Sequence, residues 1–367
     1  MQTQHLTAGF IGLGLIGGSI ARALKKQAPS TTVMAYMRSR DRLLKAQEDG
    51  AVDIILEGVG EPLRQCDIIF LCTPVEYNAS YLEQIRPYLK PGAVITDVGS
   101  TKTQIHEAVQ SLAMEESFIG GHPMAGSEKT GYENSTDHLL ENAYYILTPT
   151  DKTPESSVAM MTQTASLIGA IPLVLDYREH DRIVAAVSHL PHIIASSLVN
   201  LVRDKDGSQG LMKRLAAGGF KDITRIASAS PVMWEQICMT NETNIASLLR
   251  DYIESLNRIL TVLDSRDSDS VRELLESSRD YRNSFETRVS GPIAPDYSFS
   301  VDVCDEPGAI SIISAILAGK GISIKNIGIN HNRENGEGAL SINFYDEKSR
   351  NAAWERLKKY NYTLFNF

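Results

Sequence analysis

The sequence places one histidine in a setting that is typical of proton-transfer chemistry. His122 lies between Gly121 and Pro123, at the end of an apolar run that predicts a buried strand. A neutral imidazole there can accept a proton near neutral pH, as hydride removal from an alcohol carbon requires. Loop histidines are more often structural, but the flanking glycines and proline favour a catalytic role for His122.

A second pair of histidines, His189 and His192, lies on a long predicted helix. Their spacing of three residues puts both on one helix face. Pro191 lies between them, removes a helix hydrogen bond and predicts a kink. The costly kink indicates a binding site. The alternatives are buried structural histidines or a zinc pair, which neither an H-E-x-x-H motif nor a cysteine partner supports.

A glycine-rich segment supplies a candidate anion site. Gly218 and Gly219 open a predicted helix that includes Lys221 and Arg225. The glycines would let a ligand approach the backbone closely, and the Arg225 guanidinium offers a bidentate fork for a carboxylate. The alternative is a surface arginine paired with Asp222.

The motif Gly12-x-Gly14-x-x-Gly17 follows a predicted strand and opens a helix. Its glycines permit a tight turn and the close approach of a pyrophosphate. The charge of that group would meet the helix N-terminus around Leu15 and Ile16. The strand-turn-helix setting predicts dinucleotide binding, and the alternative is a structural turn.

The end of the second predicted strand bears on the choice of dinucleotide. An acidic residue there would bind the adenosine ribose of NAD, but this chain has Met37 followed by Arg38, Ser39 and Arg40. Two arginines with a serine could hold a 2′-phosphate, which favours NADP and leaves NAD open. In the alternative interpretation, Arg38 and Arg40 only solvate the next helix.

Two further strand ends are expected at the same edge of the sheet. Thr73 and Pro74 follow one apolar run, and Ser100 follows the next, between Asp97 and Lys102. Ligands of open parallel sheets bind outside the carboxyl ends of the strands. Ser100 could therefore face a ligand crevice, or it could serve only as a helix N-cap.

The elements that must position these residues fall into three predicted domains. Strand-helix alternation with short apolar runs predicts an α/β Rossmann-type, doubly wound domain over residues 1–176. Apolar residues at helical spacing predict an all-α helical domain over residues 177–290, with helices at 180–203, 231–264 and 267–288. Residues 183–202 are apolar all round, which suits either a buried core or a subunit interface.

A Gly-Pro linker signal precedes a small βαββαβ domain predicted over residues 296–367. This module repeats none of the catalytic features. Asp305 and Gly308 lie in its first turn, where backbone N–H groups at a helix N-terminus suit the carboxylate of an amino acid. Asn326, at the end of the second predicted strand, could bind the amino or carboxylate group.

Composition narrows the class of protein. The chain has 367 residues, 43% hydrophobic and 22% charged, as in ordinary globular proteins. The net charge of −9 disfavours nucleic-acid binding. Polar residues interrupt the longest apolar stretch, so no membrane association is expected. The absence of a signal-peptide pattern and of any C-x-x-C pair favours a cytoplasmic protein without a metal site.

In their order along the chain, these strings resemble the prephenate and arogenate dehydrogenases of tyrosine biosynthesis. The strings are G-x-G-x-x-G, D-x-G-S-x-K, G-H-P-M-A-G-x-E, S-H-L-P-H and G-G-F-K-D-x-T-R, and they span about residues 8–288. The tail resembles an ACT domain, an amino-acid-sensing module of ferredoxin-like fold. Two departures are Met37, where the family often has an acid, and Ala217, where a third glycine is common.

The resemblance implies oxidative decarboxylation of prephenate to 4-hydroxyphenylpyruvate, or the matching oxidation of arogenate, with hydride transfer to NAD(P)+. His122 would accept the proton of the C4 hydroxyl, and Ser100 would orient that histidine near the nicotinamide. Arg225 would hold the ring carboxylate, and His192 would contact the far side of the substrate. Three more residues are assigned to the substrate site: His189, Lys221 and Glu128.

The wholly apolar helix over residues 183–202 suggests a homodimer, and the separate tail leads us to expect that tyrosine binds it and inhibits the enzyme. The tail could instead be a dimerisation module without a ligand, and tyrosine could compete directly at the active site. A 3-hydroxyacid dehydrogenase is a further alternative, but residues 184–189 lack the lysine expected of it. A non-catalytic NAD(P) sensor would leave the set of His122, His192 and Arg225 unexplained.

Overall fold

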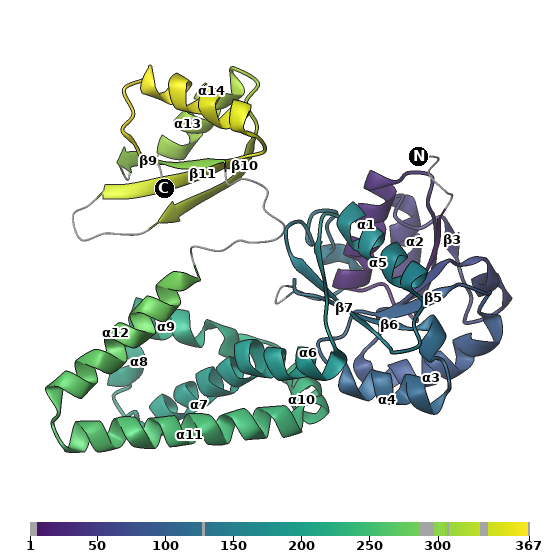
Figure 1. Cartoon of the computed structure of the whole chain (residues 1–367), viewed down its shortest axis with the longest axis horizontal. Coiled ribbons are helices and arrows are strands. Elements are labelled where there is room, and N and C mark those ends of the chain that lie inside the picture. Colours follow the sequence, from purple (N-terminus) through teal and green to yellow (C-terminus); the bar gives the residue numbers. More distant parts are fainter. Residues whose placement is uncertain are drawn as a thin grey trace. The chain divides into compact units, whose positions relative to one another are not determined.

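The computed structural model contains two units, residues 1–271 and 272–367 (Figure 1). It describes residues 6–126, 129–285, 297–304, 306, 308–330 and 337–365. All residues predicted for catalysis and for cofactor binding fall in the first unit, and the second unit contains the predicted regulatory module.

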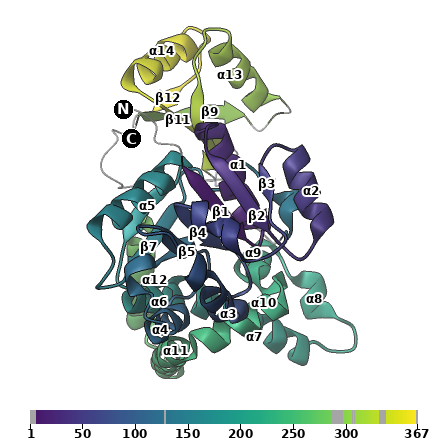
Figure 2. The same ribbon diagram turned by 90° about the vertical axis from the view of Figure 1, so that its right-hand side faces the viewer.

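Five parallel strands form the first sheet, in the order β3-β2-β1-β4-β5 (Figure 2). The strands are β1 (Thr7–Ile11), β2 (Thr32–Tyr36), β3 (Ile54–Ile55), β4 (Ile68–Leu71) and β5 (Val94–Asp97). The helices are α1 (Leu15–Gln27), α2 (Arg40–Glu48), α3 (Val75–Ile85) and α4 (Thr103–Ser111). β1, β4 and β5 are buried along their whole lengths because helices cover both faces of the sheet. This is the doubly wound, Rossmann-type arrangement that the apolar runs predict.

A second, three-stranded sheet follows the first. Its order is β6 (Ile119–Pro123), β7 (Tyr144–Pro149) and β8 (Ile171–Val174), with α5 (Glu155–Leu167) before β8. β6 runs antiparallel to β7, and a single bridge between Ile95 and Phe118 links the two sheets. These three strands therefore form a separate sheet and do not extend the parallel one. His122 pairs with Ile146 inside β6 and does not follow the strand as expected.

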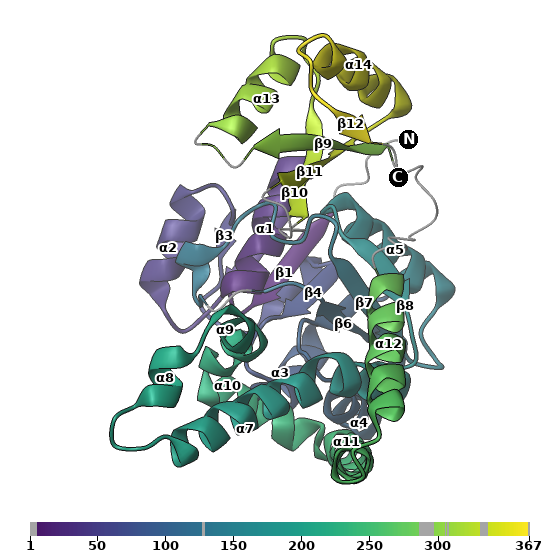
Figure 3. The same cartoon turned by 90° about the vertical axis from the view of Figure 1, so that its left-hand side faces the viewer.

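Helices make up the rest of the first unit (Figure 3). They are α6 (Tyr177–Val184), a π turn (Ala185–His189), α7 (Leu190–Lys205), α8 (Leu211–Leu215), α9 (Gly218–Thr224), α10 (Pro231–Thr240) and α11 (Glu242–Asp264), and α12 (Ser268–Ser284) crosses the unit boundary. The predicted helix over residues 231–264 is thus two helices that break at Asn241. The irregularity expected at Pro191 is a π turn just before it, and Pro191 is the second residue of α7.

The apolar run over residues 183–202 is not a buried core of the first unit. Val187 is 64% exposed and Leu201 is 54% exposed. Tyr177–Lys205 is long and apolar enough to cross a membrane by length and composition alone, with a mean hydropathy of 1.4 over its most apolar window. Core helices of soluble proteins pass the same test, so this property is weak support for a membrane span. The subunit-interface alternative for residues 183–202 stays a prediction.

The second unit contains a four-stranded antiparallel sheet in the order β10-β11-β9-β12. Its elements are β9 (Ser298–Cys304), α13 (Ala309–Ala318), β10 (Ile324–Asn330), β11 (Glu337–Phe344), α14 (Glu347–Lys358) and β12 (Leu364–Phe365). Both helices lie on one face of the sheet, where Phe299, Leu340 and Leu357 are fully buried (Figure 1). The observed order of elements is the βαββαβ order predicted from the sequence.

Candidate functional site

The glycine-rich turn between β1 and α1 leaves room for a pyrophosphate. Gly12 has φ +87°, and a Cβ there would lie 2.8 Å from the Cys72 carbonyl oxygen. A Cβ at Gly17 would lie 2.9 Å from the Cys72 Sγ atom, whereas a Cβ at Gly14 would meet no atom within 4 Å. No side chain caps the N-terminus of α1, which begins at Leu15 and continues through Ile16. Two glycines therefore fit the turn to β4, and the third leaves an open approach to a helix N-terminus, as a dinucleotide requires.

The arginines after β2 are not both free cations. The Arg40 guanidinium contacts both carboxylate oxygens of Glu57, at 2.7 and 2.6 Å. The Arg38 guanidinium lies 5.6 Å from the centre of the Tyr77 ring. Ser39 occupies the N-cap position of α2, with no side-chain capping bond. Arg40 would therefore have to exchange Glu57 for a 2′-phosphate.

The turn after β4 lies beside the glycine-rich turn. A Cβ at Gly12 would be 3.1 Å from the Thr73 Cγ2 atom. The Thr73 hydroxyl donates to the Asn78 side-chain oxygen at 2.8 Å, and Pro74 precedes the first residue of α3. Thr73 and Pro74 thus lie at the carboxyl edge of the sheet, as the sequence predicts.

Asp97, at the end of β5, ties the Ser100 segment to the His122 strand. One carboxylate oxygen accepts from the Gly121 N–H at 3.1 Å. The other accepts from the Gly99 N–H at 2.9 Å and forms a fully buried ion pair with Lys102. Ser100 and His122 therefore lie at one edge of the fold. Within the part of the chain that the structure describes, no hydrogen bond joins these two residues.

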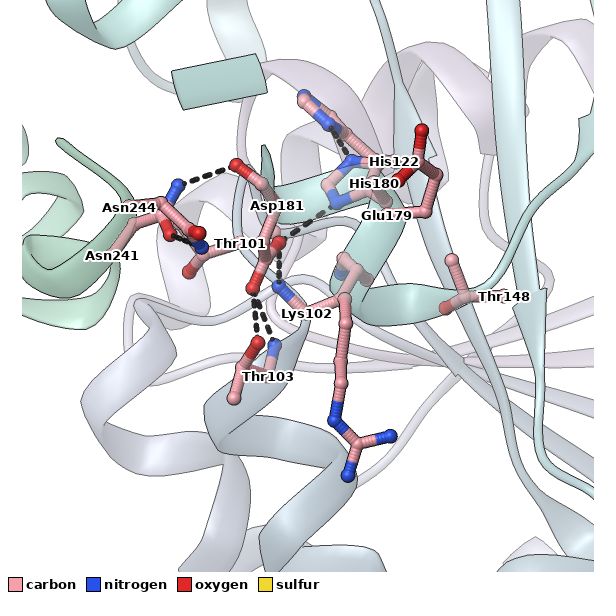
Figure 4. Close-up of polar contacts among 12 residues, drawn as sticks. Thr101, Lys102, Thr103, His122, Thr148, Glu179, His180, Asp181, Asn241 and Asn244 are labelled. Carbon is pink, nitrogen blue, oxygen red and sulfur yellow. Dashed lines mark hydrogen bonds and ion pairs between the residues drawn. The ribbon is translucent and has the colours of Figure 1, made fainter. Parts of the chain in front are cut away.

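His122 is held by a second histidine that the sequence analysis did not single out. The His122 Nδ1 atom lies 2.8 Å from the His180 Nε2 atom, and the His180 Nδ1 atom lies 2.8 Å from an Asp181 carboxylate oxygen (Figure 4). Burial, together with nearby His180, Lys102 and His189, lowers the pKa of His122 well below its ordinary value. His122 is therefore neutral at physiological pH, as a proton acceptor must be.

The two helix histidines share an aromatic partner that sequence reasoning also missed. The Trp234 ring stacks on His192, with 3.5 Å between ring centres, and meets the edge of His189 at 6.0 Å. Burial lowers the pKa of His189 to about 4 and also lowers the pKa of His192. Asn241 lies 3.2 Å from the His189 Nδ1 atom. The only sequence signal for this contact is that Trp234 follows a glycine-rich segment. The sequence alone does not distinguish such a tryptophan from an ordinary core residue.

Two more of the predicted substrate residues lie on or beside α9. Lys221 is exposed within this helix, and Arg225 is exposed directly after its last residue. α9 and the turn that follows it pack against α7, which carries His192. Glu128 lies outside the described residues. Among the residues described, no cluster of three or more His, Cys, Asp or Glu side chains is placed to hold a metal ion.

The predicted effector residues belong to the second unit. Gly308 has φ +96° and precedes α13, whose N-terminus has no side-chain cap. Asn326 lies near the start of β10, where the pairing with β11 is irregular, and not at the strand end as expected. Its side-chain oxygen accepts from the Ile327 N–H at 2.8 Å. Asp305 lies outside the described residues.

Comparisons with known proteins agree with this geometry. The family description "Prephenate dehydrogenase, nucleotide-binding domain" matches residues 20–172, and "Prephenate dehydrogenase, dimerization domain" matches residues 176–277. The chain is 38% identical to the prephenate dehydrogenase of Bacillus subtilis over 93% of each chain.

Two solved structures are also similar to this chain. Prephenate dehydrogenase from A. aeolicus in complex with hydroxyphenyl propionate and NAD+ has a TM-score of 0.73 and 27% identity, covering 78% of this chain and 100% of that one. Synechocystis arogenate dehydrogenase has a TM-score of 0.70 and 31% identity, covering 76% of this chain and 100% of that one. The chain belongs to the prephenate dehydrogenase family.

Proposed function

We propose that the chain oxidises prephenate to 4-hydroxyphenylpyruvate with loss of CO2, using a nicotinamide cofactor. The proposal rests on His122, whose pKa is lowered by burial and which follows Gly121, a residue bonded to Asp97 at the end of β5 in the sheet that also carries the open glycine turn. The nicotinamide, when bound, accepts the hydride from C4 of the substrate. Loss of the ring carboxylate as CO2 aromatises the ring, so the protein must mainly position the substrate, accept the hydroxyl proton during oxidation and return it to the phenolate oxygen of the product.

In this proposal His122 accepts the proton of the C4 hydroxyl, and Ser100 orients the hydroxyl from the neighbouring turn. Arg225 and Lys221 supply positive charge for the substrate carboxylates, because hydrogen bonds between a cation and a carboxylate are stronger than those between neutral groups. His189 and His192, backed by Trp234, line the other side of the substrate. Glu128 belongs to the same motif as His122 and is proposed to contact the substrate.

The test crosses two substrates with two cofactors. Initial rates with prephenate and with arogenate, each with NAD and with NADP, should show turnover of prephenate and formation of 4-hydroxyphenylpyruvate. His122→Asn serves as the negative control because it binds cofactor and cannot accept the proton. Faster turnover of arogenate would identify an arogenate dehydrogenase, and no turnover of either substrate would contradict the proposal.

We propose that NADP is used at least as well as NAD. No carboxylate occupies the end of β2, where Met37 packs against the core, and Arg38 extends from the same turn. The Arg40–Glu57 ion pair opposes this preference, since Glu57 competes with a 2′-phosphate for the guanidinium. Glu57→Gln should therefore lower KM for NADP more than KM for NAD, and equal KM changes would leave Arg40 out of cofactor selection.

We propose that the sheet and helices of the second unit form an ACT domain that binds tyrosine and inhibits the enzyme. The supporting features are the βαββαβ order and the uncapped N-terminus of α13 behind Gly308, which suits a carboxylate. Tyrosine inhibition of the full chain should exceed inhibition of a chain ending near Gly291. Asn326→Ala should weaken inhibition, and Lys325→Ala, also exposed and next to it, serves as the control. Equal inhibition of both chains would place tyrosine at the active site.

We also propose a homodimer formed through the helical region. α11 has one row of exposed apolar side chains, Ile253, Leu256, Leu260 and Leu263, each between 44% and 55% exposed. Their spacing places them on one face of the helix, which a second copy could cover. Sedimentation of the full chain should give twice the monomer mass, and Leu256→Glu with Leu260→Glu should shift it toward the monomer.

A further inference from the structure

A chain of hydrogen bonds runs from a buried carboxylate to His122. Asp181 is fully buried at the start of the helical region, and one of its oxygens lies 2.8 Å from the His180 Nδ1 atom. The His180 Nε2 atom in turn lies 2.8 Å from the His122 Nδ1 atom. Figure 4 shows His180 between the other two side chains.

The ionised carboxylate at one end sets the direction of both hydrogen bonds while His180 carries a single proton. Burial raises the pKa of Asp181, but hydrogen bonds from His180, Thr103 and Lys102 outweigh burial and hold the pKa below its ordinary value. An ionised carboxylate only accepts, so the His180 Nδ1 atom must carry a proton. The Nε2 atom of a neutral His180 is then an acceptor, and the His122 Nδ1 atom must donate to it. The lone pair of a neutral His122 is left on Nε2.

We propose that His180 and Asp181 are positioning residues that hold His122 with its proton on Nδ1 and its lone pair on Nε2, ready for the substrate hydroxyl. This inference rests on the proposed oxidation by His122. The C4 hydroxyl gives its proton to the His122 Nε2 atom, and the Nδ1–H bond to His180 stabilises the imidazolium that forms. The opposite tautomer would present an N–H to the hydroxyl and could not accept the proton.

Several hydrogen bonds hold Asp181 in place, so that it can fix the proton positions on His180 and His122. Its carboxylate accepts from the backbone N–H groups of Lys102 and Thr103, at 2.8 and 2.7 Å, and from the Thr103 hydroxyl at 2.6 Å. These groups form the N-terminus of α4, whose dipole favours a negative charge. Asn241 donates to the Asp181 carbonyl oxygen at 2.8 Å. Asp181 of α6 therefore caps the N-terminus of α4 and, through His180, also fixes the orientation of His122.

The groups that face His122 predict how His180 affects the pH dependence of activity. They are His180 from α6, Lys102 from the turn before α4 and His189 from the π turn, and each acts to lower the pKa of His122. Activity needs neutral His122, so it is lost as pH falls through this lowered pKa. Removal of His180 removes one of these effects and should move the acidic limb of the pH profile to higher pH.

Two substitutions of His180 separate a positioning role from a structural one. In His180→Gln the side-chain oxygen can take the place of Nε2 and accept from His122, whereas His180→Leu provides no acceptor. We expect kcat to fall about 10²- to 10⁴-fold in His180→Leu and much less in His180→Gln, with unchanged cofactor affinity in both. His106→Gln is the matched control, because His106 is equally buried but bonds to Thr148 and not to His122.

A direct readout does not depend on activity. In protein with ¹⁵N-labelled histidines, the His122 resonances, assigned with His122→Asn, should show a protonated Nδ1 and an unprotonated Nε2, and His180→Leu should disturb this pattern. A protonated Nε2 in the wild-type chain would overturn the proposal, and so would equal kcat and pH profiles in His180→Leu and His106→Gln. If the wild-type chain does not oxidise prephenate, the proposed function fails. The tautomer measurement still tests whether His180 and Asp181 hold the His122 proton on Nδ1.

Discussion

Replacing two of the three motif glycines, Gly12 and Gly14, by alanine should separate the fold of the dinucleotide turn from its binding function. Gly14 has an extended backbone, φ −84° and ψ −154°, and a Cβ there meets no atom within 4 Å. Gly14→Ala should therefore keep or slightly raise stability, by about 0.4–1 kcal/mol, because alanine restricts the unfolded chain. The same methyl group would occupy the approach to the N-terminus of α1, where the pyrophosphate is expected.

Gly12→Ala should have the opposite effect on stability. Its φ of +87° costs an L-residue about 1–2 kcal/mol. Its Cβ would lie 2.8 Å from a backbone oxygen of Cys72, which is tied to β1 by the hydrogen bond from the Cys72 N–H to the Ile11 carbonyl and cannot easily move. Overpacking adds about 1–3 kcal/mol. Together these terms predict a loss of roughly 2–5 kcal/mol in the free energy of unfolding.

The assay is unfolding with and without cofactor, combined with titration of cofactor binding. Gly14→Ala should lose roughly 5- to 150-fold in cofactor affinity, the equivalent of about 1–3 kcal/mol of steric cost. Its unfolding transition should then respond less to added cofactor than the wild-type transition does. Wild-type affinity in Gly14→Ala, or a stability loss in Gly14→Ala that equals the loss in Gly12→Ala, would refute the reasoning.

Four further predictions concern the active site and the cofactor. His122→Asn should lower kcat by about 10²- to 10⁴-fold with cofactor binding retained, and a fall of less than about fivefold would rule out the base. Because the pKa of His122 is lowered, wild-type kcat/KM should stay constant as pH falls from about 8 to below 6.5, the ordinary pKa of a histidine side chain. A loss of kcat/KM centred near pH 6.5 would contradict the lowered pKa. Arg225→Ala should chiefly raise KM, at a cost of about 2–4 kcal/mol in kcat/KM, and an unchanged KM would move the ring carboxylate elsewhere. Arg38→Ala should raise KM for NADP more than KM for NAD. If both KM values are unchanged and NAD is preferred more than tenfold, Arg38 only solvates the helix and does not select the cofactor.

Features that depend on local chemistry could be predicted from the sequence. The glycine spacing of the first turn, the doubly buried apolar strands and the βαββαβ tail could all be predicted, because backbone freedom and hydrophobic period act over a few residues. His122 could also be selected as a candidate base, since its flanking Gly121 and Pro123 mark a special position, and its catalytic role stays a prediction. The π turn could not, because Pro191 predicts an irregularity but not its type or place.

Only the tertiary structure decided which side chains act together. His180 and Asp181 look like polar residues at the start of an ordinary helix, and they reach His122 only because α6 packs against α4 and β7. Trp234 looks like a core aromatic until α10 brings it against His192. Arg40 looks like a free cation until the turn after β3 places Glu57 beside it. Burial and pairing set the charge of a side chain, and both depend on residues distant in the sequence, so the proton-accepting state of His122 was decided by the fold.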